Sequence, residues 1–99
     1  MKTFFDGIFI DEEKLKEEGK KYPIKLEYYK TIADSENVKA KYGIEIVKTE
    51  YRNENINVER DIMENVTNNT LEADRILAIL RNNIVTPIGM QDVLRDMLN

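Results

Sequence analysis

A chain of 99 residues with a formal net charge of −4 is long enough for one domain with a single hydrophobic core. Hydrophobic residues make up 41% of it and charged residues 34%, a balance that excludes an intrinsically disordered chain. Cysteine and histidine are both absent, which excludes disulfide frameworks, thiol catalysis, serine–histidine triads and metal sites built from these residues.

Residues 1–21 are expected to form an appendage to a single α+β domain of residues 22–99. Residues 1–10 predict a short strand, or two short strands about an Asp6-Gly7 turn. A helix is expected from Asp11 to about Glu18, with Gly19 after its end. Asp6 interrupts the apolar stretch that a signal peptide would need, and no apolar run is long enough to cross a membrane. A cytoplasmic protein is therefore expected.

Three further segments alternate with the period of a β-strand and predict an antiparallel meander. They cover residues 22–32, 42–52 and 56–66, and an Asn53-Glu54-Asn55 turn joins the last two. The second segment carries apolar residues on both faces, as a central strand does. In the first segment one face is formed by Ile24, Leu26, Tyr28 and Ile32.

Two amphipathic helices are predicted after the strands, joined by a Thr86-Pro87 corner. Asn69 is expected to cap the first helix, with Glu72 completing a capping box and Asn82-Asn83 ending the helix. Apolar residues recur at helical spacing in both segments: Ala73, Ile76, Leu77, Leu80 and Ile84, then Met90, Val93, Leu94, Met97 and Leu98. The expected fold is thus α+β, a three-stranded antiparallel meander packed against a C-terminal helical hairpin.

An apolar cluster near the N-terminus is the first candidate binding site. It comprises Phe4, Phe5, Ile8, Phe9 and Ile10. These residues are expected either to cap the open end of the sheet or to contact a protein partner or a second copy of the chain. Both alternatives stay open, because so many large apolar side chains exceed what one weakly amphipathic helix can cover.

Lysines and tyrosines are interleaved in residues 20–52, which makes a nucleic-acid surface the alternative. This segment holds eight cations against five carboxylates, a net charge of +3, whereas the rest of the chain carries −7. Cations and rings on a sheet face can hold phosphates and stack bases. The ordinary explanation is that tyrosines favour strands and lysines protect exposed strands from aggregation. The candidate residues are Lys25, Tyr29, Lys48, Tyr51 and Arg52.

Asp92 and Asp96 are the remaining candidates for chemistry. Four residues apart on the second helix, they could bind a hard cation or act as an acid–base pair. Arg95 lies beside them and no further acid converges on them in the sequence, so a solvated helix face is favoured. No metal, cofactor or catalytic residue is expected, and the chain is predicted to be non-enzymatic.

Short motifs give the chain a resemblance to a known family. They are Tyr42-Gly43-Ile44-Glu45-Ile46, the acidic third strand, and Thr86-Pro87-Ile88 running into Asp92-Val93-Leu94. Over residues 24–98 the chain resembles a small uncharacterised family of clostridial bacteria, classed as a domain of unknown function. The resemblance implies a bacterial cytosolic setting or a mobile element within one, and it implies no activity.

The function expected from the sequence is that of a small binding or regulatory protein acting through protein–protein contacts. A nucleic-acid accessory protein with a Lys/Tyr-rich sheet face is the alternative.

Overall fold

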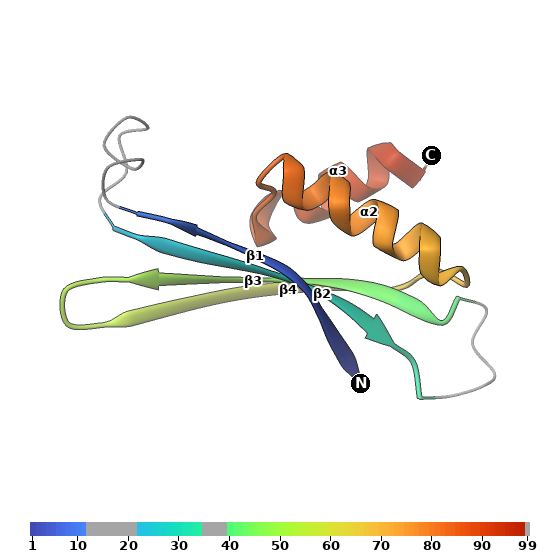
Figure 1. Cartoon of the computed structure of the whole chain (residues 1–99), viewed down its shortest axis with the longest axis horizontal. Helices are drawn as coiled ribbons and strands as arrows, with labels where there is room; N and C mark the ends of the chain where they lie inside the picture. The colour runs from blue at the N-terminus through green and yellow to red at the C-terminus, as the bar shows by residue number, and fades with distance from the viewer. Residues whose placement is uncertain (12–21, 35–39, 99) are drawn as a thin grey trace.

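The computed structural model describes residues 1–11, 22–34 and 40–98, and within them four strands precede two helices (Figure 1). The strands are β1 (Lys2–Ile10), β2 (Ile24–Ile32), β3 (Tyr42–Tyr51) and β4 (Ile56–Thr67), and the helices are α2 (Thr70–Asn82) and α3 (Pro87–Leu98). The strands form one antiparallel sheet in the order β1-β2-β3-β4. The α+β class is confirmed. The helix expected to start at Asp11 falls on residues 12–18, outside the described residues.

The expectation of a three-stranded sheet is corrected by β1, which is a fourth strand. It pairs with β2 from Lys2 opposite Thr31 to Ile10 opposite Ile24. The Asp6-Gly7 turn is not formed, and the register instead shifts at a bulge between Phe4 and Asp6. The addition of β1 to the sheet has a physical reason: without β1, the outer backbone groups of β2 would lack strand partners.

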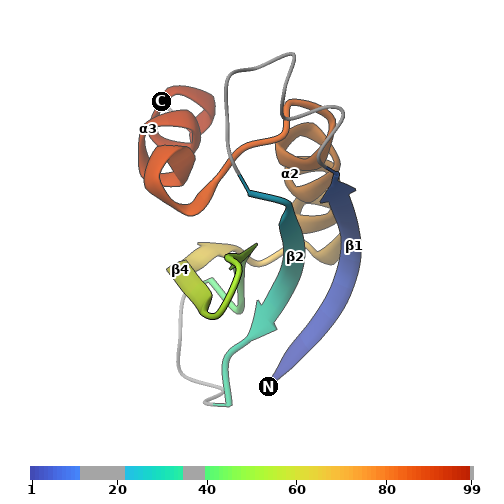
Figure 2. The ribbon, with the colours of Figure 1, turned by 90° about the vertical axis from the view of Figure 1, so that its left-hand side faces the viewer.

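Both helices lie on the same side of the sheet (Figure 2). Helix α2 contacts all four strands, whereas α3 contacts β3 and β4. The predicted apolar stripes provide the contact, and Val93 and Met97 pack at the margin of the core. Fully buried side chains from sheet and helices form its centre: Leu26, Tyr28, Ile44, Ile46, Ile76, Leu77, Leu80, Met90 and Leu94. None of the helices in the described ranges is long and apolar enough to span a membrane.

The start of α2 confirms the predicted cap and corrects the capping box. Asn69 Oδ1 accepts hydrogen bonds from the backbone N–H groups of Leu71 and Glu72, at 2.9 and 3.2 Å. The Glu72 carboxylate pairs with Arg75 instead of reaching back to Asn69, and the hydrogen bond from Arg75 lowers the pKa of Glu72. Only the Asn69 half of the capping box is therefore formed, and it satisfies two of the free N–H groups at the start of the helix.

The end of α2 differs from the sequence expectation. Asn83 is the C-cap but has φ −97°, and the left-handed residue is Ile84, at φ 52°. The Val85 N–H donates to the Leu80 carbonyl at 3.0 Å, the six-to-one bond of a Schellman motif. Ile84 is thus outside the helix, and its turn directs Val85 into the core.

Tyr28, a residue of the sheet, forms a hydrogen bond with the Val85 carbonyl. The Tyr28 hydroxyl donates to this oxygen at 2.8 Å, and the Tyr28 side chain is fully buried in the middle of β2. Burial is also the main reason why the pKa of Tyr28 rises to about 12. One hydrogen bond therefore joins the helical corner to the second strand.

Substitution of Ile84 tests the left-handed turn. Ile84→Gly and Ile84→Ala both remove the same apolar atoms beyond Cβ, but only alanine keeps a Cβ in left-handed backbone. We expect the glycine variant to be more stable than the alanine variant by about 1 kcal/mol. Urea denaturation of the two variants measures the difference. Equal stability, or a more stable alanine variant, would contradict a left-handed residue at this position.

Substitution of Tyr28 tests the bond to Val85. Tyr28→Phe leaves the Val85 carbonyl without this donor, so we expect it to lower the free energy of unfolding by about 1–3 kcal/mol at pH 7.

The pH dependence of stability provides a second readout. The folded pKa of Tyr28, about 12, lies above its ordinary value of 10.0, so its contribution is complete below pH 10 and is lost as the pH rises towards 12. The wild type should therefore lose more stability than Tyr28→Phe over this interval. Parallel losses in the two proteins would argue against a buried hydroxyl.

Candidate binding surface

Alternate residues of the four strands point away from the helices and form what we call the open face. On β1 and β2 they are Lys2, Phe4, Gly7, Phe9, Lys25, Glu27, Tyr29 and Thr31. On β3 and β4 they are Gly43, Glu45, Val47, Thr49, Tyr51, Ile56, Val58, Arg60, Ile62 and Glu64. No helix in the described part of the chain covers this face (Figure 2).

The cross-strand register arranges the open face in rows that run from β1 to β4. The central row is Gly7, Glu27, Val47 and Arg60. On one side of it lies the row Phe9, Lys25, Thr49 and Val58, and on the other the row Phe4, Tyr29, Glu45 and Ile62. Apolar side chains therefore lie mostly on the two outer strands, while the charged residues of β2 and β3 lie between them.

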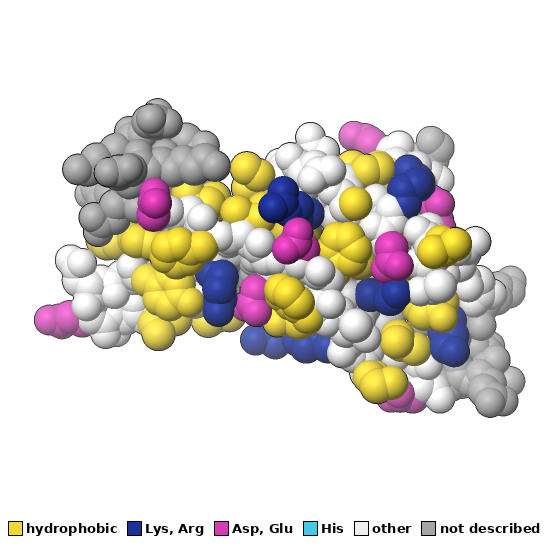
Figure 3. Space-filling view, viewed as in Figure 1, with side chains coloured by type: hydrophobic (Ala, Val, Ile, Leu, Met, Phe, Trp, Pro, Cys, Tyr) yellow, Lys and Arg dark blue, Asp and Glu magenta, His cyan; other side chains and the backbone are white. Residues whose placement is uncertain are grey.

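Large apolar side chains on these outer strands are exposed to solvent. The exposed fractions are 55% for Phe4, 61% for Phe9, 65% for Ile56, 47% for Val58 and 43% for Ile62. In the view of Figure 3, hydrophobic side chains gather over the end of the sheet that extends past the helices. Isolated exposed apolar residues are common on protein surfaces, but several on one sheet face are typical of a binding surface.

Aromatic contacts hold the rings of the open face in place. Phe4 meets Tyr29 edge to face with ring centroids 5.6 Å apart, and Phe9 lies 6.2 Å from Tyr51. The Lys2 ammonium sits over the Tyr29 ring at 4.4 Å. Side chains that are already ordered lose less conformational entropy when a partner binds, so these contacts favour binding.

Glu45 is a buried carboxylate on this otherwise accessible face. Its side chain is 3% exposed, and its oxygens lie 3.0 Å from Lys2 Nζ and 3.9 Å from Arg60 Nη1. A buried charge is costly unless it is paired, so these two cations are needed to hold Glu45 in the sheet. The pairing joins the two outer strands, β1 and β4, through β3.

A second polar group is centred on Glu27. The Tyr29 hydroxyl donates to Glu27 Oε2 at 2.8 Å, and this hydrogen bond raises the pKa of Tyr29. Lys25 Nζ lies 3.6 Å from the same carboxylate. A hydrogen bond with Tyr51, followed by the charge of Glu27, raises the pKa of Lys25. Lys25 and Tyr29 therefore both interact with the Glu27 carboxylate.

The side chains of the open face carry no net charge. The cations Lys2, Lys25 and Arg60 are matched by the carboxylates Glu27, Glu45 and Glu64, three against three. The chain as a whole carries −4, so the excess negative charge lies elsewhere.

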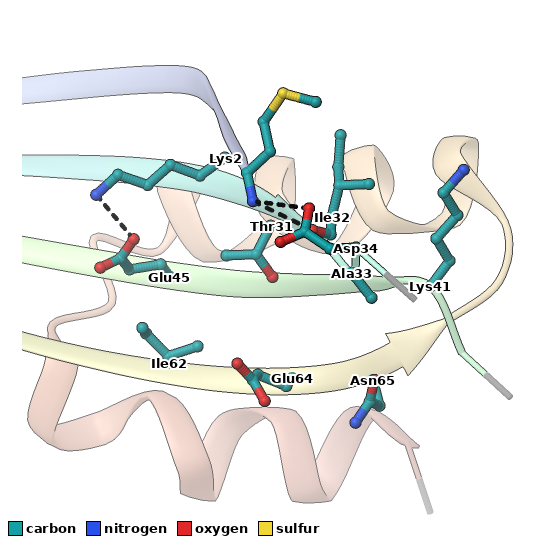
Figure 4. Close-up of a pocket in the computed structure, with 11 residues that line it drawn as sticks. Lys2, Thr31, Ile32, Ala33, Asp34, Lys41, Glu45, Ile62, Glu64 and Asn65 are labelled. Atoms are coloured by element: carbon teal, nitrogen blue, oxygen red, sulfur yellow. Dashed lines mark hydrogen bonds and ion pairs between the residues drawn. The ribbon is translucent and has the colours of Figure 1, made fainter. Parts of the chain in front are cut away.

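A hollow of about 550 Å³ lies at the Lys2 end of the open face (Figure 4). Lys2, Thr31, Glu45, Ile62 and Glu64 line it, together with residues that follow β2. Carboxylates and ammonium groups both line it, and no group of three or more metal-ligating acids forms among the described residues. The hollow therefore adjoins the open face at the end where β1 begins and β2 ends.

The structure divides the predicted N-terminal cluster between two faces. Phe4 and Phe9 belong to the open face. Phe5 and Ile8 are partly buried against the core, and Ile10 is buried beside Ile24. Part of the cluster therefore covers the core, and the Phe4 and Phe9 rings are exposed to solvent.

The predicted nucleic-acid residues are divided as well. Lys25, Tyr29 and Tyr51 lie on the open face, whereas the register places Lys48 opposite Leu26, on the helix side. Arg52 pairs with Glu50 and lies 5.8 Å from the Tyr22 ring. The five residues thus do not form one surface.

The acids of α3 remain on the helix surface. The Asp92 side chain is 81% exposed and lies 3.7 Å from Arg95 Nη1, and Asp96 is also exposed. Neither acid lines the hollow beside Lys2.

Comparison with known proteins identifies the family. A family model described as a family of unknown function, DUF6514, matches residues 8–99. The chain therefore belongs to this family, and the match begins within β1, ahead of the segment that the sequence motifs cover. Neither the curated proteins nor the solved structures give a match.

A double-mutant cycle tests the pairing between Lys2 and Glu45. Lys2→Met should destabilise the protein more than Arg60→Met, because Lys2 Nζ lies closer to the carboxylate. Glu45→Gln should reduce the cost of Lys2→Met, with a coupling of about 1 kcal/mol in thermal or urea unfolding. Strictly additive effects of the two substitutions would mean that Lys2 does not compensate the buried charge.

Proposed function

We propose that this member of the DUF6514 family is a non-enzymatic binding protein whose open face docks another polypeptide. The observation that carries the proposal is the set of exposed apolar side chains on the outer strands: Phe4, Phe9, Ile56, Val58 and Ile62. Burying such side chains is favourable by about 25 cal/mol per Å² of apolar surface removed from water. An uncovered face of this kind is therefore a source of binding energy.

The composition of the face supports a protein as the occupant. Aromatic rings and an arginine among apolar residues are typical of the energetically important residues of protein interfaces. The pairing of Glu45 and Glu27 with neighbouring groups matters too, because a carboxylate that is satisfied before docking needs no new partner. The face can thus be covered with little penalty for its charges.

Nucleic acid is a poorer occupant on electrostatic grounds. Binding to phosphates requires an excess of cations, and the open face has none. Lys25 and Tyr29 are engaged with Glu27, while Lys48 lies on the other side of the sheet. The proposal therefore favours a protein partner over the nucleic-acid alternative.

Site-specific photo-crosslinking tests the proposal in the cells that produce the protein. A photoreactive phenylalanine analogue at Val58 probes the open face, and the same analogue at Leu71 on α2, which is 75% exposed, is the matched control. We expect defined adducts with a polypeptide at Val58, in at least tenfold excess over Leu71. Equal adducts at both positions, or none at Val58, Phe9 and Ile62, would refute docking at this face.

A further inference from the structure

We propose that the polypeptide on the open face is a second copy of this chain, packed sheet against sheet about a two-fold axis nearly parallel to the strands. This inference rests on the proposed function, because it requires that the open face docks a polypeptide. Its basis is that the open face complements itself in apolar residues, shape and charge.

The symmetry operation determines which residues meet. A two-fold axis between the sheets and parallel to the strands places β1 over β4 of the partner subunit and keeps each residue at its own height along the strands. Phe4 then faces the partner subunit's Ile62, because the two belong to one cross-strand row. Phe9 faces the partner subunit's Val58 for the same reason. Each of these two apolar contacts occurs twice in the dimer, because the two-fold axis repeats it.

The central row adds complementarity of shape. Gly7 has no side chain and faces the partner subunit's Arg60, a long side chain. The Phe4 ring lies beside this low position, 3.4 Å from where a Cβ of Gly7 would stand. A guanidinium group entering there can lie against the ring, a favourable cation–π contact.

The charges favour the same arrangement. At the end of the face, Lys2 shares a row with Thr31 and Gly43, and Glu64 of β4 lies beside Gly43. The two-fold axis therefore brings Lys2 near the partner subunit's Glu64, an attractive pair. The open face is neutral, so two copies can meet there although each chain carries −4. The excess negative charge of each chain then lies on surfaces away from the interface, where the repulsion between the two chains is weaker.

The alternative two-fold axis, perpendicular to the strands, gives a worse match. With the axis along the central row, it would place Glu27 over the partner subunit's Glu27 and Arg60 over the partner subunit's Arg60. Like charges in contact cost free energy in an interface. The axis along the strands avoids both encounters, and this difference selects it.

The size of the open face is adequate for a dimer. Strands of 9–12 residues at about 3.3 Å per residue and four strands at about 4.8 Å spacing give a flat area of roughly 600 Å². Side-chain relief adds accessible surface to this value, which brings it near the roughly 800 Å² per partner of a standard interface. An axis inclined by about 15° to the strands also reproduces the roughly 30° between sheets in aligned sandwiches.

Cysteine crosslinking tests the arrangement directly, because the 99-residue chain contains no cysteine. Equimolar mixtures of single variants are treated with a short bismaleimide crosslinker, because facing sheets lie about 10 Å apart and a direct disulfide needs closer Cα atoms, and the products are analysed by intact mass. Phe4→Cys with Ile62→Cys, and Phe9→Cys with Val58→Cys, should give mixed crosslinked dimers. The displaced pair Phe4→Cys with Val58→Cys lies about 13 Å out of register and should give at least tenfold less.

Each crosslinking result decides about the arrangement. Preferred pairing of Phe4→Cys with Phe9→Cys would overturn it in favour of the perpendicular axis. Equal yields for matched and displaced pairs would indicate random collision and would also overturn it.

Light scattering of the wild-type chain supplies the independent measurement. We expect a dimer mass that shifts to the monomer mass in Ile62→Glu, while Leu71→Glu, on α2, remains dimeric. Equal melting curves of the two variants in dilute, monomeric solution exclude unfolding as the cause. A wild-type monomer at all concentrations, with an adduct to a different protein at Val58, would overturn the dimer and leave the proposed function standing.

Discussion

The hydrogen bond from the Tyr28 hydroxyl to the Val85 carbonyl is the interaction on which the arrangement of the domain depends. Tyr28 is fully buried in the middle of β2, so its hydroxyl must find a partner within the core. Val85 can offer its carbonyl there because the left-handed turn at Ile84 directs the chain inward after α2. The helical corner is thus fixed to the sheet, and the side of the sheet on which both helices lie is fixed with it.

One-sided coverage determines the properties of the remaining face. Two helices are sufficient to bury the apolar residues of β2 and β3 that face them, but the outer strands still present Phe9, Val58 and Ile62 to solvent. Glu45 shows how this face remains stable without a cover, because Lys2 and Arg60 neutralise its charge from the two outer strands. With Lys25, Glu27 and Glu64 included, the charges of the open face balance.

The elements with a regular period could be predicted from the sequence. The stripes of α2 and α3, the cap at Asn69 and the alternation of β2 depend on neighbours in the chain, and they lie where the spacing predicts. The last residue of each stripe is the exception, because Ile84 and Leu98 are exposed. The role of β1 could not be predicted in this way. Phe5 and Ile8 are three residues apart, and only the bulge after Phe4 restores them to one side of a strand.

The candidate surface was predictable in part. Phe4 and Phe9 were among the residues singled out, but the contributions of Val58, Ile62 and Glu45 depend on strand order and register, which connect residues far apart in the chain. Lys48 and Tyr51 both belong to the lysine- and tyrosine-rich segment, but their odd spacing places them on opposite faces of one strand. The turn at Ile84 carried no sequence signal, since a β-branched residue is disfavoured in left-handed backbone.

The most direct test of the central claim is a measurement of nuclear Overhauser contacts in the 99-residue chain. Isotope filtering separates the contacts within a chain from those between chains. The account predicts intrachain contacts from the Tyr28 ring to Val85 and Leu80, and none from Val58 or Phe9 to any proton of α2 or α3. Intrachain contacts between Val58 and either helix would show that the helices cover the other face of the sheet, and would contradict the account.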